Sequence, residues 1–247
     1  MAETPPGNHD DARRDDESPG IARPAASPAP IVDGAVRPKL IAAKEQWARD
    51  GRALTGQTAD PVRDRLPPGQ RLVQDWPVLD LGITPKVTTG NWTLAVDGLV
   101  DHPLSWRWED FQAQPQEHFL SDIHCVTTWS RYDNRWEGVS ARRLLALAGP
   151  KPEARFVVFH SFDGYTTNVA LEDFDDDGVL LATRWEGQPI SRDHGGPVRV
   201  ILPKLYLWKS AKWVKRIELL ARDRKGYWEV RGYHNHADPW TEERYSD

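Results

Sequence analysis

The segment HGGPVRVILPKLYLWKSAKWVKRIEL, residues 194–219, contains two apolar runs that a short connection separates. Both runs, residues 198–205 and 211–220, are rich in Val, Ile, Leu and Trp, which is typical of β-strands. Basic residues are interleaved with the apolar ones, and residues 199–225 carry nine Lys and Arg against only Glu218 and Asp223. The segment therefore predicts two strands and a local region that attracts anions.

Four further segments have the apolar or alternating pattern of strands. They are residues 91–100, 155–162, 165–171 and 178–185. One short helix is expected within residues 139–150, capped by Ser140 and ended by Gly149-Pro150, and another within residues 108–114. Because strands dominate and the helices are few and irregularly placed, the pattern predicts a mixed α+β domain rather than a doubly wound parallel sheet.

The 247 residues suit one globular domain with extensions. Residues 1–38 are rich in Pro, Asp and Ala without apolar periodicity, which predicts a disordered acidic, Pro-rich tail. Residues 39–70 are expected to form a helical arm and linker, because Leu40, Ala43 and Trp47 have helical spacing. The folded domain is therefore expected over residues 71–247.

No apolar run approaches the roughly 18 residues that cross a bilayer, so no membrane span is expected. Arg13 and Arg14 are followed by Asp15, Asp16 and Glu17, where a twin-arginine export signal needs an apolar segment. The expected location is the cytoplasm, where a lone thiol stays reduced. A net charge of -5 and basic residues interleaved with strand formers favour a compact phosphate group over a nucleic acid as the anionic partner.

Several familiar catalytic signatures are absent from the sequence. It contains no GxGxxG after a strand, no Walker loop, no HExxH and no GxSxG, which disfavours nicotinamide, nucleotide, zincin and serine-hydrolase chemistry. His234 and His236 alternate as metal ligands on a strand would, but a loop before Asp238-Pro239 is favoured over a metal pair.

Cys125 is the single cysteine, which excludes an internal disulfide framework and any site built on several protein thiolates. It lies in DIHCVTTWSRYDNRW, where Arg131 and Arg135 are candidates to favour a thiolate. Two interpretations stay open at this point: an anionic ligand or nucleophile, and a small buried hydrophobic residue. A thiol-protease site is disfavoured, because His124 and Cys125 point to opposite faces of an extended segment.

The Gly195-Gly196 turn lets the backbone approach a ligand closely, and Arg199 follows it as a forked donor. Lys209, Ser210 and Lys212 add donors on a second segment, so the two segments together form a candidate cradle for a phosphorylated cofactor. The alternative is a plain turn between two strands with solvated lysines.

At these residues the chain resembles the molybdopterin-binding oxidoreductases, a fold shared by sulfite oxidase, plant-type nitrate reductase and the catalytic subunit of bacterial methionine sulfoxide reductase. It looks most like the small cytosolic sulfite oxidase-like members. Four motifs occur in the family's order from about residue 71 to the C-terminus: IHCVTTWS, FHSFDGYTTNVALED, HGGPVRVILPKLYLWKSAKWVKRIEL and WEVRGYHNHADPW. The resemblance implies a strand-rich α+β sulfite-oxidase fold with few helices.

The resemblance also implies a molybdenum-molybdopterin cofactor (Mo-MPT) and a set of residues that bind it. Cys125 matches the cysteine whose thiolate bonds molybdenum, beside the two dithiolene sulfurs of the pterin and oxo groups. Tyr165 matches a tyrosine that points into the substrate pocket. The other matching cofactor-binding positions are Ser161, His194, Arg199, Ser210, Ala211 and Lys212, with Arg199 on the cofactor and Ser210 to Lys212 at its phosphate end.

The implied function is oxygen-atom transfer, either oxidation of a small oxyanion or reduction of an S- or N-oxide. The arginine-rich AGNRR that follows the cysteine in sulfite oxidases is replaced here by VTTWSR, which disfavours sulfite. No haem-binding module, immunoglobulin-like domain or export signal of the family is recognised, so electrons are expected to pass through a separate partner. The alternative is a non-catalytic ligand-binding module of the same fold, with a cleft built from some of the twelve tryptophans.

Overall fold

The computed structural model describes residues 32–33, 42 and 65–246. The predicted tail, apart from residues 32–33, and the helical part of the predicted arm, apart from residue 42, lie outside the described residues. The boundaries proposed at residues 38 and 70 therefore stay predictions. The described residues contain no helix long and apolar enough to cross a membrane.

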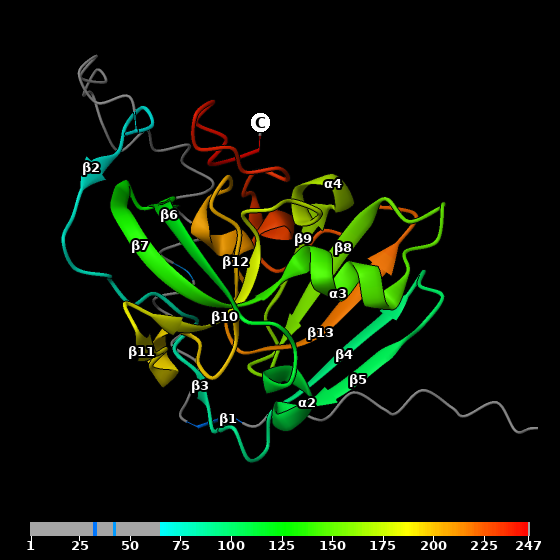
Figure 1. The fold of residues 1–247 in the computed structure, drawn as a ribbon. Coiled ribbons are helices and arrows are strands. Elements are labelled where there is room, and N and C mark those ends of the chain that lie inside the picture. The colour runs from blue at the N-terminus through cyan, green and yellow to red at the C-terminus, as the bar shows by residue number, and fades with distance from the viewer. Residues whose placement is uncertain (1–31, 34–41, 43–64, 247) are drawn as a thin grey trace, which may run out of the picture.

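Two large sheets organise the described chain (Figure 1). The six-stranded sheet has the order β11-β10-β7-β2, with β12 paired to β10 and β6 paired to β7. The five-stranded sheet has the order β5-β4-β13-β8-β9, in which β4 and β13 are parallel and the other pairs antiparallel. The six-stranded sheet comprises β2 (Arg71–Leu72), β6 (Glu117–Cys125), β7 (Trp129–Ser140), β10 (Leu180–Trp185), β11 (Gln188–Pro189) and β12 (Arg199–Ile201). The five-stranded sheet comprises β4 (Thr93–Gly98), β5 (Leu104–Arg107), β8 (Phe156–Ser161), β9 (Thr166–Ala170) and β13 (Val214–Leu220).

The remaining elements are short. A small ladder pairs β1 (Val32–Asp33) with β3 (Thr84–Pro85). The helices are α2 (Trp108–Gln112), α3 (Ala141–Ala148) and α4 (Leu171–Phe174), with single 3₁₀ turns η1 (Arg192–His194), η2 (Leu207–Lys209) and η3 (Glu229–Arg231). The expected mixed, strand-rich α+β fold with few helices is confirmed, and each of the six predicted strand segments contains a strand.

The predicted helix ends are also confirmed at α3. The Ser140 hydroxyl accepts a hydrogen bond from the Arg143 amide at 3.3 Å, and Gly149 ends the helix with a φ of 64°, a left-handed conformation that favours glycine. The β6–β7 hairpin was not predicted, because many of its positions carry polar or charged residues that alternate with buried ones.

Two apolar clusters hold the sheets together. The first packs Leu144 of α3 against Phe159 and Ile217 of the five-stranded sheet and Leu181 of β10. The second is mainly aromatic and surrounds Cys125. Its aromatic members are Trp76, Trp129, Trp136, Tyr165, Tyr206, Trp208, Trp228 and Tyr233. Five of the twelve tryptophans therefore pack in the cluster that contains the single thiol.

A buried ion pair ties the second cluster to the five-stranded sheet. Lys209 and Glu229 have fully buried side chains, and the Lys209 Nζ lies 2.7 Å from the Glu229 Oε1. The same ammonium donates to the carbonyls of Asn168 and Asn235 at 2.8 and 2.6 Å, and the Trp208 indole donates to Glu229 at 3.0 Å. Lys209 therefore serves packing rather than the candidate phosphate cradle to which the sequence assigned it.

Replacing Lys209 by methionine should lower the free energy of unfolding by about 3–5 kcal/mol, because Glu229 would stay buried without its cation. Urea unfolding of the two proteins measures the difference. Lys204→Met is the matched control, since Lys204 is 70% exposed and pairs with Asp176 at the surface, where such pairs contribute little. A loss no larger than that of the control would show that the buried pair is not a structural requirement.

Candidate active site

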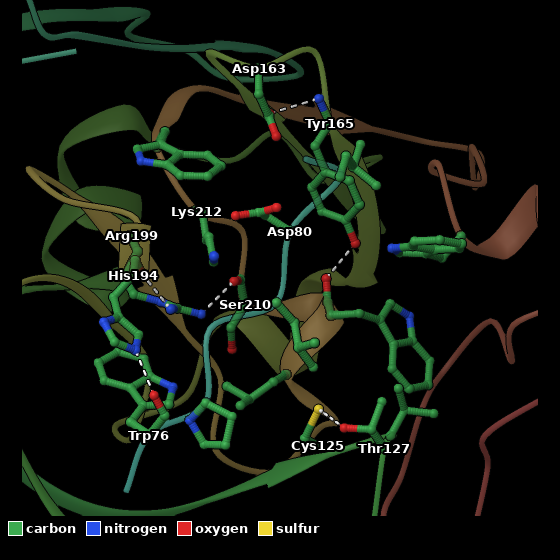
Figure 2. Close-up of a pocket in the computed structure, with 18 of the residues that line it drawn as sticks. Trp76, Asp80, Cys125, Thr127, Asp163, Tyr165, His194, Arg199, Ser210 and Lys212 are labelled. Carbon is green, nitrogen blue, oxygen red and sulfur yellow. Dashed lines mark hydrogen bonds between the residues drawn. The ribbon is translucent and has the colours of Figure 1, made fainter. Parts of the chain in front are cut away.

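A deep pocket opens where the β6–β7 turn, the segment after η1 and the segment from η2 to β13 converge (Figure 2). The empty space inside it is about 840 Å³ when its open mouth is included. The stretch from Trp76 to Leu81 forms another wall. Both Cys125 and Arg199 line this pocket.

Cys125 ends β6 and begins a tight turn. The Thr128 amide donates to the Cys125 carbonyl at 3.0 Å, and Thr128 has a φ of 70°. The Cys125 sulfur is 3.2 Å from the Thr127 hydroxyl oxygen, and the side chain faces the pocket although it is only 5% exposed. The turn therefore presents the sulfur to the pocket and shields it from bulk water.

The two arginines predicted to favour the thiolate lie elsewhere, which corrects that expectation. The Arg131 guanidinium donates to the Gln74 carbonyl at 3.0 Å and stacks over Trp185, and Arg135 is exposed. Neither lines the pocket, because strand alternation turns both side chains to other surroundings. The prediction that His124 and Cys125 point apart agrees with the structure, since buried His124 does not line the pocket and lies 2.8 Å from the Ser130 hydroxyl.

Arg199 is a buried cation without a carboxylate partner among residues 65–246. Its guanidinium donates to the carbonyls of His194 and Ser210 at 2.6 and 3.0 Å, while its buried Nε has no hydrogen-bond partner in the described chain. Burial alone lowers the pKa of Arg199 to about 9. Because an uncompensated buried charge is costly, this side chain requires an anion that the described residues do not provide.

Lys212 adds a second cation close to Arg199. Its ammonium donates to the Asp193 carbonyl at 2.6 Å. Desolvation, with a further contribution from the charge of Arg199, lowers the pKa of Lys212 to about 7. A side chain at Gly195 would place its Cβ 2.9 Å from that of Lys212, and Gly195 has a φ of 107°, so glycine is required there.

His194 is held by its neighbours at the rim of the pocket. Its Nε2 donates to the Trp76 carbonyl at 2.8 Å, and its ring stacks on Trp76 with a centroid distance of 4.1 Å. Burial is the main cause that lowers the pKa of His194, so the ring is neutral at pH 7. Ser210 also lines the pocket; its carbonyl binds Arg199, and its hydroxyl accepts from the Leu202 amide at 3.0 Å.

Two of the residues matched by resemblance do not reach the pocket wall. Ser161 and Ala211 are fully buried and are not among the lining residues. The Ala211 carbonyl accepts from the Val200 amide at 2.9 Å, so this residue ties the lysine segment to β12. Both positions support the wall from behind in the described structure.

Tyr165 lines the pocket with its hydroxyl already engaged. The hydroxyl donates to the Trp208 carbonyl at 2.6 Å, and burial raises the pKa of Tyr165 well above its ordinary value. The hydroxyl proton is therefore used in this hydrogen bond to the backbone, and Tyr165 forms a fixed part of the pocket wall.

Sequence reasoning missed several lining residues. Asp163 lies opposite the cations; it accepts from the Tyr165 amide at 2.9 Å, and burial raises its pKa to about 6. Asp80 extends into the pocket from the covering stretch (Figure 2). Trp228 and Tyr233 also line the pocket. The Asp163-Gly164 turn was a usable signal, whereas nothing in the local pattern marks Asp80.

Within the pocket, several polar side chains lie apart from the Cys125 sulfur. In Figure 2, Arg199, His194, Lys212 and Asp80 lie away from Cys125 and Thr127. Tyr233 lies on the sulfur side, since Cys125 is among the groups that raise its pKa. No set of three or more His, Cys, Asp or Glu in the described part of the chain is placed to hold a metal unaided. His234 and His236 lie in a loop outside the pocket, paired with Glu243.

A family described as the oxidoreductase molybdopterin binding domain matches residues 81–228, which is more than half of the chain. The "Uncharacterized oxidoreductase YuiH" of Bacillus subtilis is 44% identical over 183 residues, covering 74% of this chain and 92% of that protein. A "Protein-methionine-sulfoxide reductase catalytic subunit MsrP" of Campylobacter jejuni is 27% identical over 166 residues, covering 60% of this chain and 56% of that protein.

Two further matches extend the comparison. A "Nitrate reductase [NADPH]" of Beauveria bassiana is 29% identical over 178 residues, which cover 61% of this chain but only 20% of that protein. The crystal structure of the sulfane dehydrogenase SoxCD from Paracoccus pantotrophus is similar in fold, with a TM-score of 0.54 and 20% identity over 76% of this chain and 62% of that chain.

The chain belongs to the molybdopterin-binding oxidoreductase family. The predictions of a molybdenum-molybdopterin cofactor and of an oxidoreductase are thereby confirmed, and nothing in the comparisons favours the non-catalytic binding module. The pocket fits this cofactor: the Cys125 thiol lines it for the metal, and Arg199, which has no carboxylate partner in the described chain, suits an anionic phosphate together with Lys212. One protein thiol suffices, because the pterin brings its own sulfurs to the metal.

The low pKa of Lys212 predicts a pH dependence of cofactor affinity. A bound anion raises this pKa above about 7, so binding takes up a proton and the affinity of cofactor-free protein falls as the pH rises through 7. The slope should not exceed about tenfold per pH unit for one proton. Titration of the purified cofactor-free protein with molybdopterin, followed by tryptophan fluorescence, measures it.

Lys212→Arg is the control for this titration, because arginine keeps its charge over the whole range. The variant should bind with a flatter profile between pH 6 and pH 9. An unchanged slope in Lys212→Arg would assign the proton to another group.

Proposed function

We propose that this chain is a reductase that removes an oxygen atom from uncharged S- or N-oxides. The observation that carries the proposal is the chemistry of the pocket around Cys125. Val126, Thr127 and Trp129, which follow Cys125 in the lining, are uncharged, and Tyr233, which lies on the sulfur side, contacts Trp208 and Trp228. The cations Arg199 and Lys212 lie toward the other end of the pocket, where they suit the anionic part of the cofactor (Figure 2).

The aromatic side chains form a rigid surface for the apolar groups of such a substrate. The ring of Tyr233 contacts those of Trp208 and Trp228 with centroid distances of 5.2 and 5.0 Å. Trp208 is fixed by Glu229, and its carbonyl holds the Tyr165 hydroxyl. A sulfoxide or amine oxide combines a polar oxygen with apolar groups, so it gains from this surface, whereas an oxyanion would lose hydration without a cation nearby.

The reaction consumes two electrons and two protons for each oxygen atom released as water. When bound, the molybdenum cofactor would supply the two-electron redox chemistry of oxygen-atom transfer. The protein orients the substrate on the aromatic surface and limits access of water to the sulfur. Asp163 exchanges a proton near neutral pH, since burial raises its pKa to about 6, which suits a group that delivers protons to the pocket.

The comparison with a methionine sulfoxide reductase catalytic subunit supports this direction of transfer, and the comparison with a nitrate reductase supports an oxyanion as the alternative substrate. In either case we propose that electrons come from a separate partner protein. The cytoplasmic location stays a prediction.

A substrate panel with reduced viologen as electron donor tests the proposal. The molybdenum-loaded enzyme should reduce dialkyl and aryl sulfoxides or N-oxides, and should neither reduce nitrate nor oxidise sulfite at a comparable kcat/KM. Trp228→Ala should raise KM for an aryl sulfoxide about tenfold or more, because it removes a large part of the apolar surface. Its molybdenum content should stay at the wild-type level.

Trp240→Ala is the matched control, since Trp240 is 48% exposed and lies outside the pocket. It should leave KM unchanged. Preferential turnover of nitrate or sulfite by the wild type would reject the uncharged-oxide assignment and favour the oxyanion alternative.

A further inference from the structure

The turn that carries Cys125 is held from behind by two side chains that are remote in sequence. The Gln70 side-chain amide donates to the Cys125 carbonyl at 3.2 Å, across 55 positions of the chain. The Arg244 guanidinium donates to the Val126 carbonyl at 2.8 Å, across 118 positions. The first comes from the segment before β2 and the second from the C-terminal segment, so both ends of the described domain meet at this turn.

Gln70 is itself fixed by a directed chain of hydrogen bonds. The Ser130 hydroxyl donates to the Gln70 amide oxygen at 3.4 Å, which leaves the same hydroxyl to accept from the His124 Nδ1 at 2.8 Å. All three side chains are buried. The amide of Gln70 is therefore oriented so that its donor end meets the Cys125 carbonyl.

Arg244 is a buried cation whose partners are mainly backbone oxygens. It is 5% exposed, donates to the carbonyls of Val126 and Pro68, and lies over the Tyr206 ring at 5.0 Å. Glu242 is 3.7 Å away and half exposed, so its carboxylate offsets the charge only in part. Holding a guanidinium at this place costs free energy of desolvation, and packing alone does not require a charge there.

We propose that Gln70 and Arg244 are positioning residues that lock the Cys125 turn in one geometry for its bond to molybdenum, and that the Arg244 charge raises the reduction potential of the metal. Groups that orient a metal ligand from behind control how well the ligand binds and what it donates. A positive charge beside an anionic ligand favours the more reduced, more negative state of the centre. The proposal rests on Cys125 being the metal ligand.

Three variants test the proposal: Arg244→Gln, Arg244→Lys and Gln70→Met. In the molybdenum-loaded fraction, Arg244→Gln should shift the visible sulfur-to-molybdenum absorption, lower the midpoint potential and reduce kcat per molybdenum about 10- to 100-fold with KM little changed. Arg244→Lys should recover most of the potential, because it keeps the charge, but little of the absorption, because an ammonium cannot hold both carbonyls. Gln70→Met should shift the absorption and leave the potential nearly unchanged.

Arg155→Gln is the matched control, since exposed Arg155 also donates to two backbone carbonyls but lies away from the pocket. Variants that melt at lower temperature while their loaded fraction keeps the wild-type absorption and potential would overturn the proposal. If Arg244→Gln does not fold, Gln70→Met still decides the positioning claim and Arg244→Lys the charge claim.

Cys125→Ser separates this proposal from the assignment on which it rests. If Cys125→Ser has the absorption of the wild type, Cys125 is not the metal ligand, and the assignment on which the proposal rests is wrong. A changed absorption in Cys125→Ser, together with unchanged Gln70→Met and Arg244→Gln, would reject only the positioning residues.

Discussion

The guanidinium of Arg199 is the charge around which the site is arranged. It is 3% exposed, it is bound to two backbone carbonyls, and it forms no ion pair within residues 65–246. Burial that lowers an arginine pKa to about 9 reflects a desolvation cost that the fold alone does not offset. An anionic cofactor held by Arg199 would offset this cost, and Cys125 would supply the thiolate for its metal. The local electrostatics indicate an anionic ligand, and family membership identifies it as the molybdopterin cofactor.

The fold serves this arrangement by bringing distant segments to one place. The β6–β7 hairpin ends in the cysteine turn, β12 carries Arg199, and the segment before β13 carries Lys212. Within the pocket, Arg199 and Lys212 lie away from the sulfur, and the lining residues that follow Cys125 are uncharged. Gln70 and Arg244, from the two ends of the described domain, bind the backbone carbonyls of the cysteine turn outside the pocket.

Much of the fold was predictable because its signals are local. Apolar runs located six strands, and the capping serine and terminal glycine located α3. The β6–β7 hairpin was not predictable in this way, because its strands are stabilised by cross-strand pairing and by a core that other segments supply. Arg199 and Cys125 were recognised from motif order, and the structure places both in one pocket.

The residues that sequence reasoning misplaced show which contacts a local sequence pattern does not predict. Two arginines close to Cys125 in sequence, Arg131 and Arg135, point away from it. Arg244 is far from Cys125 in sequence, yet it donates a hydrogen bond to the carbonyl of the next residue, Val126. Asp80 reaches the pocket from a stretch without regular structure. Lys209 belongs to a buried ion pair, which its basic, strand-rich surroundings did not reveal. Such contacts depend on tertiary packing, so a single sequence does not encode them in any short window.

The sulfur coordination of molybdenum tests the central claim most directly. X-ray absorption at the molybdenum edge should show one sulfur ligand fewer in Cys125→Ser than in the wild-type protein, with the pterin sulfurs retained in both. Equal sulfur coordination in the two proteins, or wild-type protein that takes up no molybdenum in molybdate-fed cells, would contradict the account.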